Sequence, residues 1–193
     1  MNDQPKEAGV KERIMNAATR LFYQQGYRAT GINQIIEEAQ IAKSSLYQHF
    51  ASKDLLLDEY LLSAKDQWIE DLAAFTANLP EGREKLLAFF DFRRRRLEQH
   101  EFKGCTFSRV IYELPNLGQT SADIIRNHKS TLRAFITTQL RAIKDPYPEA
   151  DLEEMTDLLF NLSEGAVLHS TLFNNSKPLE DAKKTVGKLL KTI

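Results

Sequence analysis

Lys43, Ser44 and Ser45 open a short amphipathic segment with side chains that can donate hydrogen bonds. Leu46 and Phe50 supply apolar positions in the same segment. A helix of about two turns, polar at its N-terminal end and apolar on its inner side, suits insertion into the major groove of DNA. These residue types in this order therefore indicate nucleic-acid recognition.

Residues 30–42 predict the helix and the turn that position this segment. One helical face is marked by apolar residues at i, i+3, i+4 and i+7, namely Ile32, Ile35, Ile36 and Ala39. Thr30 precedes them, and its hydroxyl is expected to accept an unpaired amide of the first turn. With the break at residues 40–42, the two segments form a helix-turn-helix.

Two further helices are predicted on either side of this pair. Apolar spacing indicates a helix over about residues 10–25, and Gly26 is expected to supply a left-handed stop. A long helix over residues 53–78 follows, with Ser52 as its expected N-cap and Asp54 in its first turn. This long helix leads from the reading unit into the rest of the chain.

The remaining sequence predicts helices only. The expected ranges are about 83–98, 104–114, 119–144, 149–174 and 178–191. The fold class is therefore all-α with about nine helices: an N-terminal three-helix helix-turn-helix unit and a larger C-terminal helical bundle. We expect a DNA-binding domain at residues 8–68, with the helix-turn-helix motif at 31–50, and a ligand-binding and dimerisation domain at 69–193.

Composition and charge exclude several classes of protein but do not identify the function. The chain has 193 residues, of which 42% are hydrophobic and 27% charged, as in soluble globular proteins. A single cysteine, Cys105, excludes an intrachain disulfide framework and fits a reducing cytosol. No signal-peptide pattern or long apolar run is present, so we expect a cytoplasmic protein with no membrane partner. Residues 1–53 hold seven Lys and Arg against five Asp and Glu, only a slight basic excess.

The helix-turn-helix and its flanks carry a family resemblance over about residues 10–68. The matching positions are Ala17–Ala18, Leu21–Phe22, Gly26–Tyr27, Thr30, Ile32, Ile35, Ala39, Lys43, Leu46–Tyr47, Phe50, Ser52–Lys53 and Leu55. This pattern resembles the TetR family of bacterial transcriptional regulators. Two positions depart, since Gln40 stands where the family usually has Gly, and Ala42 where it usually has a capping Ser or Thr. Ser44 or a DNA phosphate is expected to replace the missing cap.

The resemblance implies a set of DNA-contacting residues. They are Thr30, Lys43, Ser44, Ser45, Tyr47, Gln48, His49 and Lys53. Lys53 matches a phosphate-binding lysine, Tyr47 and His49 match sugar–phosphate contacts, and a Gln side chain can read an adenine edge. For Tyr47 the alternative is packing inside the unit, and for His49 it is simple exposure.

Candidate effector-binding residues in the C-terminal part are aromatic or heterocyclic. Trp68, Phe89, Phe92, Phe107, Tyr112 and His169 are expected to line a small-molecule cavity, with ordinary core packing as the alternative. The run Arg93–Arg96 is expected to be a solvated segment paired with Asp91, Glu98 and Glu101. Cys105 is expected to be a small buried residue, and the alternative is a thiol sensor activated by Lys103.

No pattern of residues predicts an enzyme. Paired catalytic carboxylates, metal-spaced ligands and a nucleophile elbow do not stand out, and the histidines are scattered at positions 49, 100, 128 and 169. We therefore expect no catalytic residues, no metal and no cofactor.

The resemblance implies a ligand-responsive transcriptional repressor. Such a protein binds a near-palindromic double-stranded DNA operator as a homodimer and releases it when a small-molecule effector binds. We expect the dimer to form through the helices at about 149–174 and 178–191. The open alternative is a helical small-molecule- or partner-binding protein that no longer reads DNA, since Gln40, Ala42 and the nearly neutral N-terminal unit depart from the DNA-reading pattern.

Overall fold

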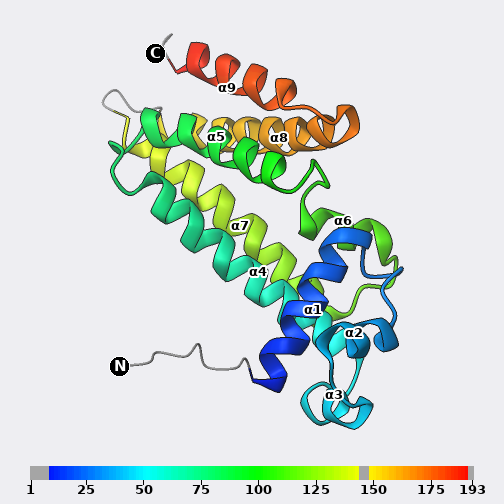
Figure 1. The fold of residues 1–193 in the computed structure, drawn as a ribbon. Coiled ribbons are helices and arrows are strands. Elements are labelled where there is room, and N and C mark those ends of the chain that lie inside the picture. Colours follow the sequence, from blue (N-terminus) through cyan, green and yellow to red (C-terminus); the bar gives the residue numbers. More distant parts are fainter. Residues whose placement is uncertain (1–8, 144–147, 191–193) are drawn as a thin grey trace, which may run out of the picture. The chain divides into compact units, whose positions relative to one another are not determined.

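A computed structural model describes residues 9–143 and 148–190, and within these ranges the chain forms nine α-helices and no strand (Figure 1). The helices are α1 Val10–Gln25, α2 Ile32–Ala39, α3 Lys43–His49, α4 Lys53–Thr76, α5 Arg83–Gln99, α6 Thr106–Glu113, α7 Gln119–Arg141, α8 Glu149–Phe173 and α9 Lys177–Leu189. The all-α prediction is confirmed. The expected helix ends at residues 144 and 191 lie outside the described residues. None of the described helices is long and apolar enough to span a bilayer.

The helices belong to two compact units. Unit 1 contains the chain up to Ala64 together with Thr106–Ile124, and unit 2 contains Lys65–Cys105 together with the chain from Ile125 onward. Helix α6 therefore groups with the helix-turn-helix, although it follows α5 in sequence. The expected domains, 8–68 and 69–193, follow the linear order of the chain, and they stay a prediction.

The core of unit 1 is built from the helical faces that the apolar spacing marked. In α1, all five residues of that spacing are buried, namely Ile14, Ala17, Ala18, Leu21 and Phe22. Ile35 of α2 and Leu46 of α3 are each 0% exposed, so both helices of the helix-turn-helix pack against this face of α1. Fully burying one isoleucine, leucine or phenylalanine side chain stabilises the folded state by about 1.5–3 kcal/mol.

The core of unit 2 combines aromatic and aliphatic side chains. The Trp68 ring of α4 lies edge-on to Phe92 of α5 at 5.0 Å and to His128 of α7 at 5.2 Å, measured between ring centroids. Leu140 of α7 and Val186 of α9 are fully buried in the same core. The unit therefore holds α5, α8 and α9 against the C-terminal parts of α4 and α7.

Two expected helix signals differ from the structure, and one agrees with it. Gly26 has the expected positive φ of 92°, but its ψ of 163° is extended, so it ends α1 without a left-handed helical residue. The N-cap of α2 is Gly31, and the Thr30 hydroxyl instead donates to the carbonyl oxygen of Gly26 at 2.7 Å, so the predicted Thr30 cap is wrong. Ser52 does cap α4, since its hydroxyl accepts the Leu55 N–H at 3.1 Å.

Candidate functional site

The turn between α2 and α3 depends on Gln40 in a left-handed conformation. Its φ and ψ are 52° and 53°, and its N–H donates to the carbonyl of Glu37 at 3.1 Å. The next amide, Ile41 N–H, reaches back to Ile36 at 3.2 Å, which satisfies carbonyls at the end of α2. A side chain at such a position costs on the order of 1 kcal/mol relative to glycine. Gln40 therefore makes the turn at that cost.

Helix α3 begins without a side-chain cap. Ala42 occupies the N-cap with φ −74° and ψ 148°, and its carbonyl accepts the amides of Ser45 at 3.0 Å and Leu46 at 3.3 Å. The expectation that Ser44 replaces the cap is wrong, because no side-chain hydrogen bond caps this helix. The first turn of α3 is the positive end of the helix, and a phosphate oxygen is a suitable acceptor for its amides.

The side chains of α3 separate into an anchored face and an exposed face. Leu46 is 0% exposed and Phe50, directly after the helix, is 5% exposed, so these two hold α3 on the unit 1 core. The exposed residues are Lys43, Ser44, Tyr47, Gln48 and His49, and Ser45 is half-buried. Because Tyr47 is 44% exposed, the alternative that it packs inside the unit is wrong. These exposed side chains are available for base and phosphate contacts, and the contacts themselves stay a prediction.

Lys53 and Thr30 are less available than the rest of the predicted set. The Lys53 ammonium donates to the Tyr27 carbonyl oxygen at 2.5 Å and lies 3.9 Å from the centre of the Tyr27 ring. Burial lowers the pKa of Lys53, against the opposing effect of Asp54 and Glu113. Thr30 is 1% exposed. Phosphate contacts from both residues stay predictions, and each requires the side chain to leave its present partner.

Glu113 is a residue of this unit that sequence reasoning missed. Its carboxylate accepts the backbone N–H of Arg28 at 3.1 Å, and a Cβ atom on Gly26 would collide with it. On the same helix, the Arg109 guanidinium donates to the Tyr23 carbonyl oxygen at 2.6 Å. Helix α6 therefore holds the end of α1, through Arg109, and the segment between α1 and α2, through Glu113.

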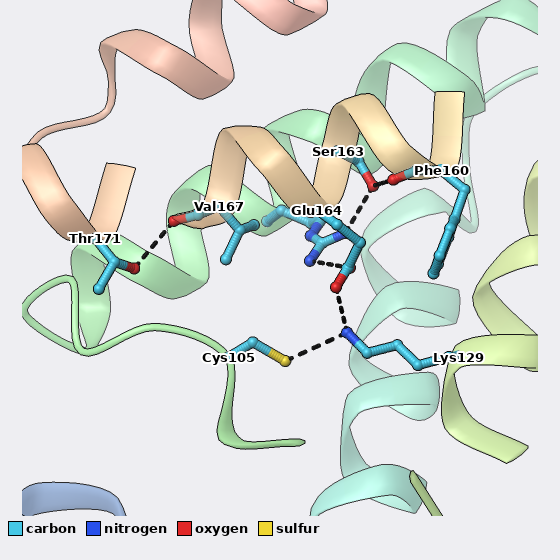
Figure 2. Close-up of polar contacts among 8 residues, drawn as sticks. Cys105, Lys129, Phe160, Ser163, Glu164, Val167 and Thr171 are labelled. Atoms are coloured by element: carbon cyan, nitrogen blue, oxygen red, sulfur yellow. Dashed lines mark hydrogen bonds and ion pairs between the residues drawn. The ribbon is translucent and has the colours of Figure 1, made fainter. Parts of the chain in front are cut away.

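Unit 2 contains a partly buried charged cluster that the sequence did not predict (Figure 2). Arg93 of α5 donates to the Ser163 hydroxyl and to the Glu164 carboxylate of α8, each at 2.7 Å. The other Glu164 oxygen accepts from Lys129 of α7 at 2.5 Å, and Lys129 Nζ lies 3.7 Å from the Cys105 sulfur. Burial opposes ionisation of Glu164, but Arg93 and Lys129 outweigh it and lower its pKa to about 2.

The arginine run therefore splits into different environments. Arg93 is 5% exposed, so the prediction that it is solvated is wrong, whereas Arg94 pairs with Glu98 at 2.9 Å as expected. Arg96 pairs with Asp71. Of the other acids named, Asp91 pairs with Lys183 and Glu101 with Lys103. Lys129 therefore lies beside Cys105, which is half-buried rather than fully buried, and the alternative of a thiol sensor activated by Lys103 stays untested.

The predicted effector-binding residues are only partly brought together. Trp68, Phe89 and Phe92 form one aromatic cluster in unit 2. Phe107 and Tyr112 lie on α6 in unit 1, where Phe107 is buried and Tyr112 is 78% exposed. His169 is exposed on α8, with its ring 6.1 Å from that of Phe173. A lining role for the six residues stays a prediction.

The sequence matches two family descriptions that together cover both parts of the chain. Residues 14–60 match "Bacterial regulatory proteins, tetR family", and residues 82–186 match "Tetracyclin repressor-like, C-terminal domain". The chain belongs to the TetR family. It is a helix-turn-helix transcriptional regulator that binds DNA, and regulators of this family form dimers on their operators.

Relatives and solved structures agree with this membership. The chain is 28% identical over 185 residues to the HTH-type transcriptional regulator LmrA of Bacillus subtilis, covering 94% of this chain and 96% of LmrA. It is 28% identical over 151 residues to the transcriptional repressor KstR2 of Mycobacterium tuberculosis, covering 76% and 72%. A TetR regulator from Chloroflexus aurantiacus superposes with a TM-score of 0.82 at 25% identity, over 94% of each chain. A TetR-family regulator from Streptomyces coelicolor has the same fold, with a TM-score of 0.86 at 24% identity over 97% of this chain and 91% of that one.

Proposed function

We propose that this TetR-family regulator is a homodimeric repressor. It binds a near-palindromic operator through α3, and it releases the operator when a small molecule binds in unit 2. The observation that carries the operator-reading part is the exposed face of α3. Its polar side chains project from a helix anchored by Leu46 and Phe50, and its first turn lacks a side-chain cap. A rigid helix with open amides and exposed donors is equipped for both phosphate and base contacts.

The homodimer proposal rests on an exposed apolar stretch of α8. Its large apolar residues are 48–71% exposed, namely Leu158, Leu168, Leu172 and Phe173. Gly165 lies between them in sequence, and a Cβ there would meet no atom within 4 Å, so another helix can approach closely. Exposed apolar surface of this kind marks an association site. A second copy of α8 and α9 is the partner that gives a two-fold dimer with half-sites about 34–36 Å apart.

The effector proposal rests on the buried charges and aromatic rings of unit 2. Ionised groups inside a helical domain are costly unless paired, and perturbed carboxylates cluster at functional sites. Glu164 between Arg93 and Lys129 is such a group.

The choice between repressor and activator rests on two relatives. KstR2 is named a repressor, whereas FasR of Mycolicibacterium smegmatis, 32% identical over 105 residues, is named an activator. The repressor assignment follows the relative that matches more of the chain.

The deciding experiment measures whether the protein binds a specific operator and whether binding lowers or raises transcription. Fluorescence anisotropy with duplexes tiling the region upstream of the protein's own gene is expected to identify one near-palindromic site. That site should bind about 10³-fold or more tighter than a shuffled duplex at physiological salt. In vitro transcription from the same promoter should then fall on addition of the protein. Equal affinity for all duplexes would remove the operator-reading proposal, and increased transcription would replace the repressor by an activator.

A further inference from the structure

A groove between α4 and α5 in unit 2 is distinct from both the DNA-reading face and the Glu164 cluster. Its volume is about 370 Å³, within the range of small-molecule sites. Phe75 and Phe92 form its aromatic floor, with ring centroids 5.6 Å apart and planes inclined at 51°. The remaining side chains that line it and that matter here are Asp71, Arg95, Arg96 and Gln99.

Arg96 is held in place on one side of this groove. Its guanidinium donates to one Asp71 oxygen at 2.7 Å and lies 5.6 Å from the centre of the Phe92 ring. The other Asp71 oxygen accepts from the Gln67 amide at 2.9 Å. Both carboxylate oxygens therefore already have a donor, while the guanidinium has further N–H groups in its planar fork. Preorganisation of this kind lowers the cost of binding an anion.

Arg95 adds a second cation to the groove. The other three members of the run pair with Glu164, Glu98 and Asp71, respectively. Across the described ranges 9–143 and 148–190, the structure shows no hydrogen bond or ion pair for the Arg95 side chain, which is exposed. Two guanidinium groups thus face the groove against one carboxylate. The charge that complements this arrangement is negative.

We propose that this groove binds a small aromatic carboxylate. The ring would lie against Phe75 and Phe92, where offset or edge-on aromatic contacts are favourable. The carboxylate would be received by Arg95 and Arg96, because a planar guanidinium matches a carboxylate in geometry and charge. A neutral aromatic amide lacks the charge and a short aliphatic carboxylate lacks the ring, so each satisfies only half of the site. The inference concerns binding alone and does not depend on operator release.

The first test compares three ligands on the full-length protein by isothermal titration calorimetry. Benzoate is expected to bind at least tenfold more tightly than benzamide, which keeps the ring, or acetate, which keeps the charge. Arg95→Gln should weaken benzoate binding about tenfold, since a charge-assisted hydrogen bond of modest strength corresponds to that factor. No benzoate binding, or equal affinity for benzoate and benzamide, would overturn the proposal.

Arg94→Gln is the matched control. Arg94 is adjacent on the same helix and carries the same charge, but it pairs with Glu98 and lines a separate groove between α5 and α9. Its substitution should change benzoate affinity less than twofold. An equal loss of affinity in both variants would mean that benzoate responds only to the overall positive charge, and it would overturn the site.

Ala74→Phe tests the cavity itself, because Ala74 is an exposed lining residue. It should abolish binding while thermal stability stays unchanged, and retained binding would place the ligand elsewhere.

Discussion

The Glu113 carboxylate of α6 accepts the backbone N–H of Arg28, at 3.1 Å and across 85 residues of sequence. This hydrogen bond holds the segment immediately before α2, so α6 supports the helix-turn-helix although it lies outside the N-terminal sequence. Thr106, the first residue of α6, directly follows Cys105, the last residue of this stretch of unit 2. A displacement of α6 would therefore reach the reading helices through Glu113.

Glu113→Ala should weaken operator binding by roughly fivefold to tenfold, because the Arg28 amide loses its acceptor and the segment before α2 loosens. An amide left without a partner costs about 1–3 kcal/mol when buried, and less at a partly exposed site such as this. Operator anisotropy and urea unfolding would measure the two effects. Glu113→Gln is the control, since its amide oxygen can still accept; if both variants bind operator like the wild type, α6 does not position the reading head.

Much of unit 1 follows from local sequence patterns, whereas this contact does not. The buried positions of α1 and the exposed face of α3 were predictable because helical spacing alone determines which side faces the core. Glu113 was not predictable, because its partner is a backbone amide far away in sequence. Arg93 was misjudged for a related reason: neighbouring acids suggested a solvated segment, but its partner Glu164 lies on α8, 71 residues away. Long-range partners of charged side chains have no local sequence signal.

Lys53→Ala should reduce the salt dependence of operator binding. If the Lys53 ammonium leaves the Tyr27 carbonyl for a phosphate, the slope of log K against log [salt] becomes shallower by about 0.9 for each lost contact, one per protomer. Sequence preference should not change. The control is Lys184→Ala on α9, an exposed lysine of unit 2. A lower stability with an unchanged slope would show that Lys53 serves only to hold the Tyr27 carbonyl.

Ala42→Ser should stabilise unit 1 by about 0.5–2 kcal/mol, because a serine hydroxyl at the N-cap can accept a first-turn amide of α3. The gain would be measured by urea unfolding at neutral pH. Ala42→Val serves as the control, because valine has no capping hydroxyl and ranks with alanine at the N-cap, so it should give no such gain. In the wild type, hydrogen exchange of amides 43–46 should slow on operator binding, and equal protection in both states would contradict a phosphate acting as the missing cap.

His128→Leu should remove part of the acid sensitivity of unit 2. Burial, reinforced by Lys129 and Arg93, lowers the pKa of His128 to about 3. Below pH 6.5 the unfolded chain therefore binds a proton that the folded protein does not, so stability rises with pH between about 3 and 6.5. Between pH 6.5 and 4.5 one such group accounts for about 2 kcal/mol of the change in stability. Urea unfolding should show a flatter pH dependence in the variant.

The control for this pH dependence is His169→Leu, because His169 is exposed on α8. Its removal should leave the slope between pH 6.5 and 4.5 as in the wild type. Glu164 acts over a lower range, since its pKa of about 2 lies below the ordinary value of 4.5 and its contribution is lost as pH falls through that interval. A wild-type slope in the His128 variant would show that His128 is not kept neutral by its surroundings.

Leu172→Glu should convert the proposed dimer to monomers. Leu172 is 71% exposed on α8, so a carboxylate there is tolerated by the folded chain but not between two apolar faces. Analytical ultracentrifugation should show the wild type at twice the chain mass of 22.1 kDa and the variant at that mass. Operator affinity should fall at least 100-fold at nanomolar protein, because one short helix makes few base contacts and a specific site requires both reading heads. The control is Leu79→Glu, because Leu79 is an exposed leucine outside α8 and α9, and this variant should remain dimeric. A wild-type protein that sediments as a monomer at micromolar concentration would contradict the two-fold mechanism.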